Sequence, residues 1–126
     1  MKKKIIIADD NANIRLMLHE FLKSDYEVVS FENGNGILGW LKEGNFPDLI
    51  IADVMMPKLN GWELINNLKL SLFYKEIPVL VLSGIEKSQE RVRFLEAGAD
   101  EFMVKPFSPV ELKARINNIF KRYNYA

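Results

Sequence analysis

Residues 5–11 read IIIADDN and residues 49–57 read LIIADVMMP, and both stretches follow the same pattern. Each is a short aliphatic run that ends abruptly in acid, at Asp9 and Asp10 in the first and at Asp53 in the second. A continuous aliphatic run of this length is typical of a parallel strand that is buried on both faces. Two such strands that end in carboxylates suggest that these acids meet at one edge of a sheet.

Short apolar runs recur along the chain, and their content of β-branched or aromatic residues indicates strands. They cover residues 5–8, 28–31, 49–52, 79–82 and 102–104. Helical spacing is clearest at 14–22 and 112–123, is present at 64–68, and is weaker at 34–43 and 87–97. The alternation predicts an α/β fold, a parallel sheet with helices on both faces, because crossovers between parallel strands are right-handed. Ligands bind such sheets beyond the carboxyl ends of the strands, where the strand order reverses.

The composition bounds the class of protein. With 126 residues, the chain is expected to form a single domain over residues 1–126, with no output domain of its own. Its 17 basic and 17 acidic side chains cancel, so no overall charge favours nucleic acid or an anionic membrane. The chain has no cysteine, which excludes thiol chemistry and fits a reducing compartment, so we expect a cytoplasmic protein. The apolar run after the opening lysines is too short for a signal peptide.

Residues that could bind a metal ion or an anion lie just past four of the predicted strands. They are Asp9 and Asp10, Asp53, Ser83 and Gly84, and Lys105. Two carboxylates about 4 Å apart repel by about 4 kcal/mol at an effective dielectric constant of 20, so three of them must share protons or a cation. Because the ligands on offer are oxygen atoms, the expected cation is Mg²⁺, with Mn²⁺ as a substitute.

The remaining groups suit a phosphoryl group beside such a metal ion. Lys105 supplies a positive charge, Ser83 a hydrogen-bond donor, and Gly84 a backbone N–H with no side chain in its way. Asp53 is then a nucleophile as well as a metal ligand. Carboxylate attack on phosphorus gives an aspartyl-phosphate, and its catalysis consists mostly of positioning groups and neutralising charge.

Four segments together carry a resemblance to a known family. They read IIIADDN (5–11), LIIADVMMPKLNGWEL (49–64), PVLVLSG (78–84) and AGADEFMVKPFSPVEL (97–112). Over nearly its whole length the chain resembles the receiver domain of two-component response regulators. The resemblance implies a flavodoxin-like (βα)5 fold with strand order 2-1-3-4-5. It also implies a Mg²⁺-dependent phosphorylation switch and not an enzyme, although such a switch can catalyse its own phosphorylation and dephosphorylation.

Roles for individual residues follow from the resemblance, position by position. It implies Asp53 as phosphoacceptor, Asp9 and Asp10 as metal-site acids, the Met55 backbone carbonyl as a further metal ligand, and Ser83 and Lys105 as contacts of the phosphoryl oxygens. Phe102 falls at the family's aromatic switch position and would turn inward when Ser83 moves toward the phosphate. Lys105–Pro106 would be a cis peptide bond.

Partners are also implied by the resemblance. A sensor histidine kinase or a histidine phosphotransfer protein would supply the phosphoryl group. The output surface would be the fourth helix, fifth strand and fifth helix, with a mixed set of charges: Arg91, Arg93, Glu96, Asp100, Glu101, Glu111, Lys113 and Arg115. Such a surface could serve a homodimer or, in a monomeric adaptor, bind another protein, and the sequence does not decide between these two alternatives. Direct nucleic-acid binding by this chain is not expected.

Several residues could instead have a structural role, and other classes of protein must also be considered. Asp10 or Asn11 could cap the first helix, Ser83 could cap the fourth, and Ser108 with Glu111 predicts a capping box at the last. A flavin carrier would need a glycine-rich phosphate loop where this chain has acids.

Three expectations concern activity. An aspartate-nucleophile phosphatase would need an acid two residues after Asp53, where this chain has Met55. A degenerate receiver, working as a phosphorylation-independent interaction module, remains a further alternative. The resemblance also implies slow loss of the phosphoryl group, because Met55 and Ile85 stand where the family often has polar residues that help to position water.

Overall fold

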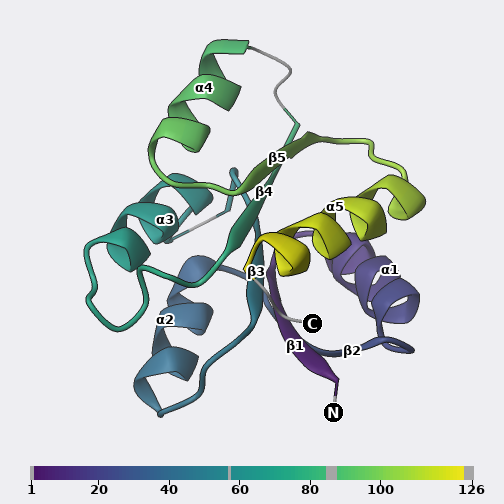
Figure 1. The fold of residues 1–126 in the computed structure, drawn as a ribbon, viewed down its shortest axis with the longest axis horizontal. Coiled ribbons are helices and arrows are strands. Elements are labelled where there is room, and N and C mark those ends of the chain that lie inside the picture. The colour runs from purple at the N-terminus through teal and green to yellow at the C-terminus, as the bar shows by residue number, and fades with distance from the viewer. Residues whose placement is uncertain (1, 57, 85–87, 124–126) are drawn as a thin grey trace.

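A computed structural model describes residues 2–56, 58–84 and 88–123 of the chain. Five parallel strands form one sheet in the order β2-β1-β3-β4-β5, which confirms the predicted order. The strands are β1 (Lys3–Ala8), β2 (Tyr26–Phe31), β3 (Leu49–Asp53), β4 (Val79–Ser83) and β5 (Glu101–Val104). The order reverses at β1, because the chain passes to β2 on one side and then returns to β3 on the other (Figure 1).

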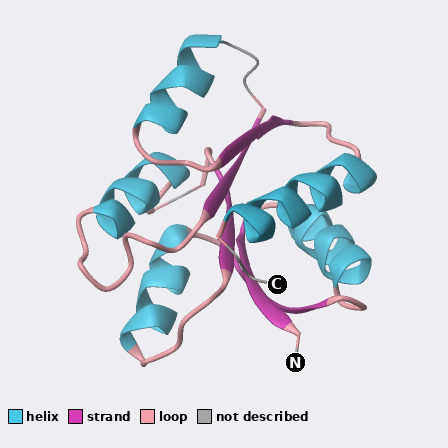
Figure 2. Ribbon diagram, viewed as in Figure 1, coloured by secondary structure: helices cyan, strands magenta, loops and turns pink. Residues whose placement is uncertain are grey.

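Helices cover both faces of this sheet (Figure 2). They are α1 (Ala12–Leu22), α2 (Gly34–Lys42), α3 (Gly61–Lys69), α4 (Ser88–Glu96) and α5 (Pro109–Arg122). Buried residues of α2, α3 and α4 share one hydrophobic cluster, and those of α1 and α5 share the other. The alternation of side chains along each strand divides the core in this way: in β1, Ile6 belongs to the first cluster and Ile5 and Ile7 to the second.

The two central strands reach further than the aliphatic pattern predicted. Asp53 is the last residue of β3 and pairs with Leu82, and Ser83 is the last residue of β4 and pairs with Val104. The ladder hydrogen bonds come from the backbone, so a polar side chain does not end a strand. Both side chains are therefore held by the sheet itself and not by a loop.

The structure confirms some of the predicted helix N-caps. Asn11 caps α1, where its side chain accepts hydrogen bonds from the N–H groups of Asn13 and Ile14. Ser83 does not cap α4, which begins five residues later at Ser88. Ser108 caps α5 as predicted by accepting a hydrogen bond from the Glu111 N–H.

The complete capping box lies at a place that the sequence analysis did not identify. At the start of α3, the Asn60 side chain accepts a hydrogen bond from the Glu63 N–H, and the Glu63 carboxylate accepts one from the Asn60 N–H. At α5 the Glu111 carboxylate lies instead 3.8 Å from Arg115 Nε. The described helices include none with the length and apolar character needed to cross a membrane.

Candidate functional site

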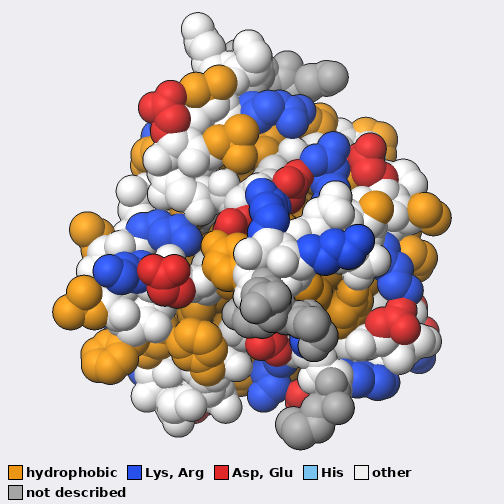
Figure 3. All heavy atoms as spheres, in the orientation of Figure 1, with side chains coloured by type: hydrophobic (Ala, Val, Ile, Leu, Met, Phe, Trp, Pro, Cys, Tyr) orange, Lys and Arg blue, Asp and Glu red, His pale blue; other side chains and the backbone are white. Residues whose placement is uncertain are grey.

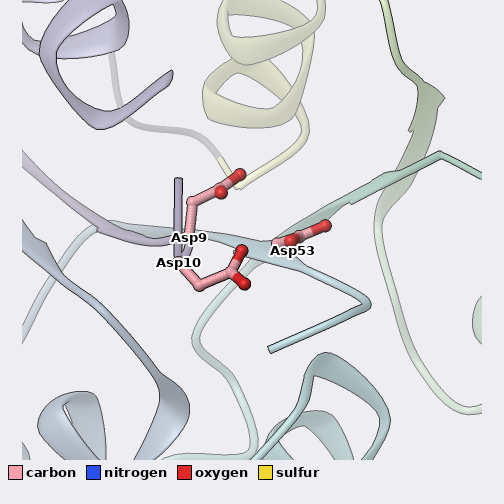
Figure 4. A group of neighbouring side chains, drawn as sticks. All are labelled: Asp9, Asp10 and Asp53. Atoms are coloured by element: carbon pink, nitrogen blue, oxygen red, sulfur yellow. The ribbon is translucent and has the colours of Figure 1, made fainter. Parts of the chain in front are cut away.

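Three carboxylates meet at the carboxyl edge of the sheet, beside the point where the strand order reverses. Asp9 and Asp10 follow β1, and Asp53 ends β3 (Figure 4). One oxygen atom of each lies within 4.8 Å of the corresponding atoms of the other two. Asp9 and Asp53 are buried, whereas Asp10 is exposed. The strands β1 and β3 thus bring together acids that lie more than forty residues apart in sequence, as predicted.

Each polar atom of Asp9 has a hydrogen-bond partner. Its N–H donates to the Phe31 carbonyl (3.1 Å), and its Oδ1 accepts from the Asn11 N–H (2.9 Å). Its Oδ2 accepts from Lys105 Nζ (2.9 Å), and its carbonyl accepts from Arg15 Nη1 (2.6 Å). A charged group that is completely buried is tolerated only with partners of this kind. Asp9 is consequently fixed in both position and orientation.

Lys105 connects the two buried acids. Its Nζ lies 2.9 Å from Asp9 Oδ2 and 3.1 Å from Asp53 Oδ1, and its side chain is 20% exposed. Burial lowers the pKa of the Lys105 ammonium, but the hydrogen bonds to Asp9 and Asp53 outweigh this, and the pKa lies above its ordinary value. Lys105 therefore remains positively charged beside the two acids.

The Asp53 carboxyl is destabilised in its ionised form. Burial raises its pKa, and the charge of Asp9 raises it further. Hydrogen bonds from Lys105 and from the Met55 backbone N–H lower the pKa without cancelling the rise. Three negative charges against the one positive charge of Lys105 leave a formal charge of −2, so the site is short of positive charge by the amount that one divalent cation carries.

The other predicted contacts of a phosphoryl group lie at neighbouring strand ends. Ser83 is completely buried, and its carbonyl accepts a hydrogen bond from the Lys105 N–H (2.7 Å). Gly84 is exposed, and a Cβ built there would have no atom within 4 Å, which leaves the approach to its backbone open. The Lys105–Pro106 bond is cis, as the family resemblance implied.

Phe102 occupies the position of a core residue. It is 2% exposed, and its ring packs against Phe94 of α4 at a centroid distance of 5.8 Å. Phe94 in turn meets Trp62 of α3 edge to face at 5.2 Å. Arg91 lies over the Phe102 ring, with its guanidinium carbon 5.4 Å from the centroid. The aromatic chain joins β5, α4 and α3.

Met55 is 64% exposed, so its apolar side chain faces solvent beside the acid cluster. Ile85, the other residue on which slow dephosphorylation was predicted, lies outside the described residues. The slow loss of a phosphoryl group therefore stays a prediction.

The charges assigned to the output surface divide into two groups. Arg93 stacks on Trp62 at 3.9 Å, Asp100 accepts hydrogen bonds from Val79 and Tyr123, and Lys113 forms an ion pair with Asp25. These three therefore serve contacts inside the chain. The other five are Arg91, Glu96, Glu101, Glu111 and Arg115, and the contacts described for them stay within α4, β5 and α5: Arg91 lies over the Phe102 ring, and Arg115 pairs with Glu101 and Glu111. Acidic and basic side chains alternate over this part of the molecule (Figure 3).

Two features of the site were not identified from the sequence. Arg15, one turn into α1, holds the Asp9 carbonyl, and only its spacing after the acid pair could have indicated this. An apolar groove of about 310 Å³ also begins beside Lys105, and its lining includes Ile14, Met17 and Phe107. No sequence pattern pairs α1 with the segment after β5, because they meet only in the folded chain.

Comparison with known proteins adds independent information. A family model described as "Response regulator receiver domain" matches residues 5–117. The chain is 40% identical over 123 residues to the "Probable transcriptional regulator ycf27" of Pyropia yezoensis, covering 96% of this chain and 49% of that protein. It is 38% identical over 127 residues to the "Alkaline phosphatase synthesis transcriptional regulatory protein PhoP" of Bacillus subtilis, covering 100% of this chain and 52% of that protein. The chain thus spans about half the length of these curated relatives.

Solved structures agree in fold. A putative response regulator from Chloroflexus aurantiacus matches with a TM-score of 0.90 at 30% identity, covering 96% of this chain and 99% of that one. The "BeF3 Activated DrrB Receiver Domain" matches with a TM-score of 0.84 at 29% identity, again covering 96% of this chain and 99% of that one.

Proposed function

This chain belongs to the family of response regulator receiver domains, and from that premise we propose that it is a switch in which Asp53 accepts a phosphoryl group. Members of this family are signalling switches of two-component systems and not enzymes in the ordinary sense. The single observation that carries the proposal is the placement of Lys105 Nζ within 3.1 Å of Asp53 and 2.9 Å of Asp9. A nucleophile, its metal-site neighbour and a positive charge are thereby held together.

The residues present fit a magnesium ion. The three convergent carboxylates offer only oxygen atoms, which is the donor set that Mg²⁺ prefers, and the formal charge of −2 matches one divalent cation. Asp9, Asp10 and Asp53 would hold the ion, with the Met55 carbonyl as a further ligand. When bound, the ion supplies positive charge to the acids and to the oxygens of an incoming phosphoryl group.

The residues of this chain then have distinct tasks. An oxygen atom of the Asp53 carboxylate forms a bond to phosphorus as the P–N bond of a phosphohistidine breaks, and the departing imidazole nitrogen takes up a proton. Lys105 neutralises charge on the transferred oxygens, and the Ser83 hydroxyl and the Gly84 N–H donate hydrogen bonds to them. Because Asp53 is only 4% exposed, its donor must approach along the open carboxyl edge of the sheet.

The donor that we propose is a histidine kinase or a histidine phosphotransfer protein. The groove lined by Ile14, Met17 and Phe107 opens beside Lys105, and Met17 and Leu16 of α1 are 37% and 62% exposed. An apolar surface next to the nucleophile suits the docking of a partner helix that carries the phosphorylated histidine. Binding there would place the donor within reach of Asp53.

The output passes, in our proposal, to the face of α4, β5 and α5. Phosphorylation adds close to two negative charges, which Ser83 and Lys105 would bridge. Ser83 ends β4, and its neighbour β5 carries Phe102, whose ring packs on α4. A shift at Ser83 can therefore reach α4 through adjacent packed groups. The face would form a homodimer or bind another protein as a monomer.

The two alternative functions have less support from the residues of this site. A degenerate receiver would not need to retain Lys105 in contact with both buried acids. A phosphatase would need a second acid near Asp53, but its neighbour two residues on is the exposed and apolar Met55. Neither rival accounts for the lysine bridge as directly as phosphoryl acceptance does.

Intact-mass spectrometry tests the proposal. The full chain is incubated with Mg²⁺ and a small phosphodonor such as acetyl phosphate, and a mass increase of one phosphoryl group is expected. Asp53→Asn should show none, because its amide is not a nucleophile. Asp48→Asn serves as matched control, because Asp48 contacts the Lys4 N–H at the other end of the sheet. Absence of the modification in the wild-type chain, or its persistence in Asp53→Asn, would refute the proposal.

A further inference from the structure

Arg15 makes an unusual contact for a surface helix residue. Its side chain is 19% exposed, and Nη1 donates to the Asp9 carbonyl at 2.6 Å. Nη2 lies 3.8 Å from Glu32, which follows β2. The guanidinium thus connects the first turn of α1 with the ends of β1 and β2. Among the contacts that the structure describes, the Arg15 side chain makes none with a carboxylate oxygen of the acid cluster.

The carbonyl that Arg15 holds belongs to the peptide bond between Asp9 and Asp10. A peptide unit is planar, so fixing this oxygen also fixes the direction of the Asp10 N–H and the starting point of its side chain. Asp10 needs such support more than its neighbours. Within residues 2–56, 58–84 and 88–123, its carboxylate has no hydrogen bond or ion pair, whereas Asp9 and Asp53 are both held by Lys105.

Arg15 should affect the cation affinity of the site in two opposite ways, through its charge and through the geometry that it imposes. A positive charge near the acids repels an approaching cation, although Glu32 offsets part of it. Holding the Asp9–Asp10 peptide, in contrast, favours cation binding because the carboxylate is placed in advance. The two roles can therefore be separated by the direction in which cation affinity changes.

We propose that Arg15 is a positioning residue for the metal site: by fixing the Asp9–Asp10 peptide it presents the exposed carboxylate of Asp10 to a divalent cation. This rests on the proposed function, since it assumes that the acid cluster binds Mg²⁺. Partners one step removed from a metal commonly contribute a factor of about 10 to 100 in affinity. We expect a contribution near the lower end, because Asp9 and Asp53 stay in place without Arg15.

Isothermal titration calorimetry with Mg²⁺ on the full chain measures this contribution. Arg15→Met keeps an apolar stem but removes the donor, and we expect about 10-fold weaker binding. Arg15→Lys retains a donor and should recover part of the loss. At saturating Mg²⁺, phosphorylation of Arg15→Met by acetyl phosphate should return to nearly the wild-type rate, because the defect lies in cation binding.

A matched control is available in Arg122, which also donates to a backbone carbonyl, that of Asp100, and pairs with a glutamate, Glu101. Arg122→Met should leave Mg²⁺ affinity unchanged. Unchanged or tighter binding by Arg15→Met would overturn the inference and leave the proposed function intact, as would equal weakening by Arg122→Met. Failure of the wild-type chain to bind Mg²⁺ would instead refute the proposed metal site, and this inference with it.

Discussion

At the end of β3, the Asp53 carboxylate is placed where its charged form is disfavoured. Burial and the charge of Asp9 raise its pKa, and Lys105 compensates only in part. A buried carboxylate that is short of compensating charge tends to attract a cation or a proton. The same conflict should make the cation-free protein less stable than it would be with a neutral side chain at position 53.

Replacement of Asp53 by Asn should therefore stabilise the cation-free protein. We expect roughly 1 kcal/mol in the free energy of unfolding, and an increase in melting temperature of a few degrees, because repulsion from Asp9 is removed. Thermal unfolding in the presence of a chelator measures the difference. A lower melting temperature for Asp53→Asn would show that its attraction to Lys105 outweighs the repulsion.

The stabilisation by Asp53→Asn should also depend on pH. The pKa of Asp53 is raised in the folded chain, so the folded state holds its proton at pH values where the unfolded chain has lost it. The contribution of this group is present below its unfolded pKa of about 3.9 and is lost as pH rises through the folded pKa. The advantage of Asp53→Asn should accordingly grow as pH increases from about 4 toward neutrality. An advantage that shrinks over this range would contradict the assigned direction.

The elements around the site differ in how tightly they are attached to the sheet. The N-terminus of α3 approaches β3 so closely that a Cβ at Gly61 would lie 2.6 Å from the Asp53 carbonyl oxygen. In α2, by contrast, a Cβ at Gly39 would meet no atom within 4 Å. In α4, Phe94 alone is completely buried, whereas α5 buries four residues. Of these four helices, α4 has the fewest buried residues.

Two glycine substitutions should have opposite effects on stability. Gly61→Ala should lower the free energy of unfolding by about 1 to 3 kcal/mol, because the new methyl group forces α3 away from the strand that carries Asp53. Gly39→Ala should raise it by about 0.5 to 1 kcal/mol, because alanine favours an exposed helix position. Urea unfolding of both variants measures these changes. Equal tolerance at the two positions would disprove the close approach at Gly61.

The attachment of α4 can be measured by hydrogen exchange. Amides of Ser88–Glu96 should exchange faster than those of Pro109–Arg122, because a single buried ring anchors the shorter helix. Phe94→Leu removes the ring contacts with Trp62 and Phe102 and should accelerate exchange in α4 selectively. Val92→Ala, at a position that is 49% exposed, is the matched control. Protection of α4 equal to that of α5 would argue against α4 as the mobile element.

At the scale of the whole molecule, the chemistry and the proposed output lie at separate places that the sheet connects. The acid cluster lies at the carboxyl edge of β1 and β3, while the mixed charges lie over α4, β5 and α5 (Figure 3). Arg115 and Glu101 already form an ion pair within the chain, which Arg122 extends. In a dimer through this face, these charges would already be partly neutralised by ion pairs within each chain. The strength of the dimer should therefore depend on exposed residues such as Glu111.

Beryllofluoride, which mimics the phosphoryl group, should convert the Mg²⁺-loaded chain from monomer to dimer in sedimentation velocity. Glu111→Lys should weaken that dimer by roughly 10-fold, because a like charge replaces an opposite one at the contact. Glu20→Lys provides the control: both glutamates are 57% exposed and each has a basic partner three or four residues further along the chain, but Glu20 lies on α1. A chain that remains monomeric with beryllofluoride bound would instead support the monomeric adaptor.

The sequence by itself determined the fold class and which charged residues meet at the carboxyl edge of the sheet. Aliphatic runs that end in acid predict buried parallel strands, and parallel strands place their carboxyl ends at one edge, so Asp9, Asp10, Asp53 and Lys105 had to converge there. Because N-caps depend on local hydrogen bonds, the caps at Asn11 and Ser108 could also be predicted from a few neighbouring residues. These features depend on periodicity and on short-range contacts, which a sequence displays directly.

Only the tertiary structure decided which atoms face one another across the fold. The contact of Arg15 with the Asp9 carbonyl, the groove between α1 and Phe107, and the turning of Lys113 toward Asp25 each join residues whose side-chain directions depend on how helices pack on the sheet. The last of these removed one charge from the predicted output surface. Helix rotation is set by the summed packing of the core, so no single local pattern in the sequence encodes it.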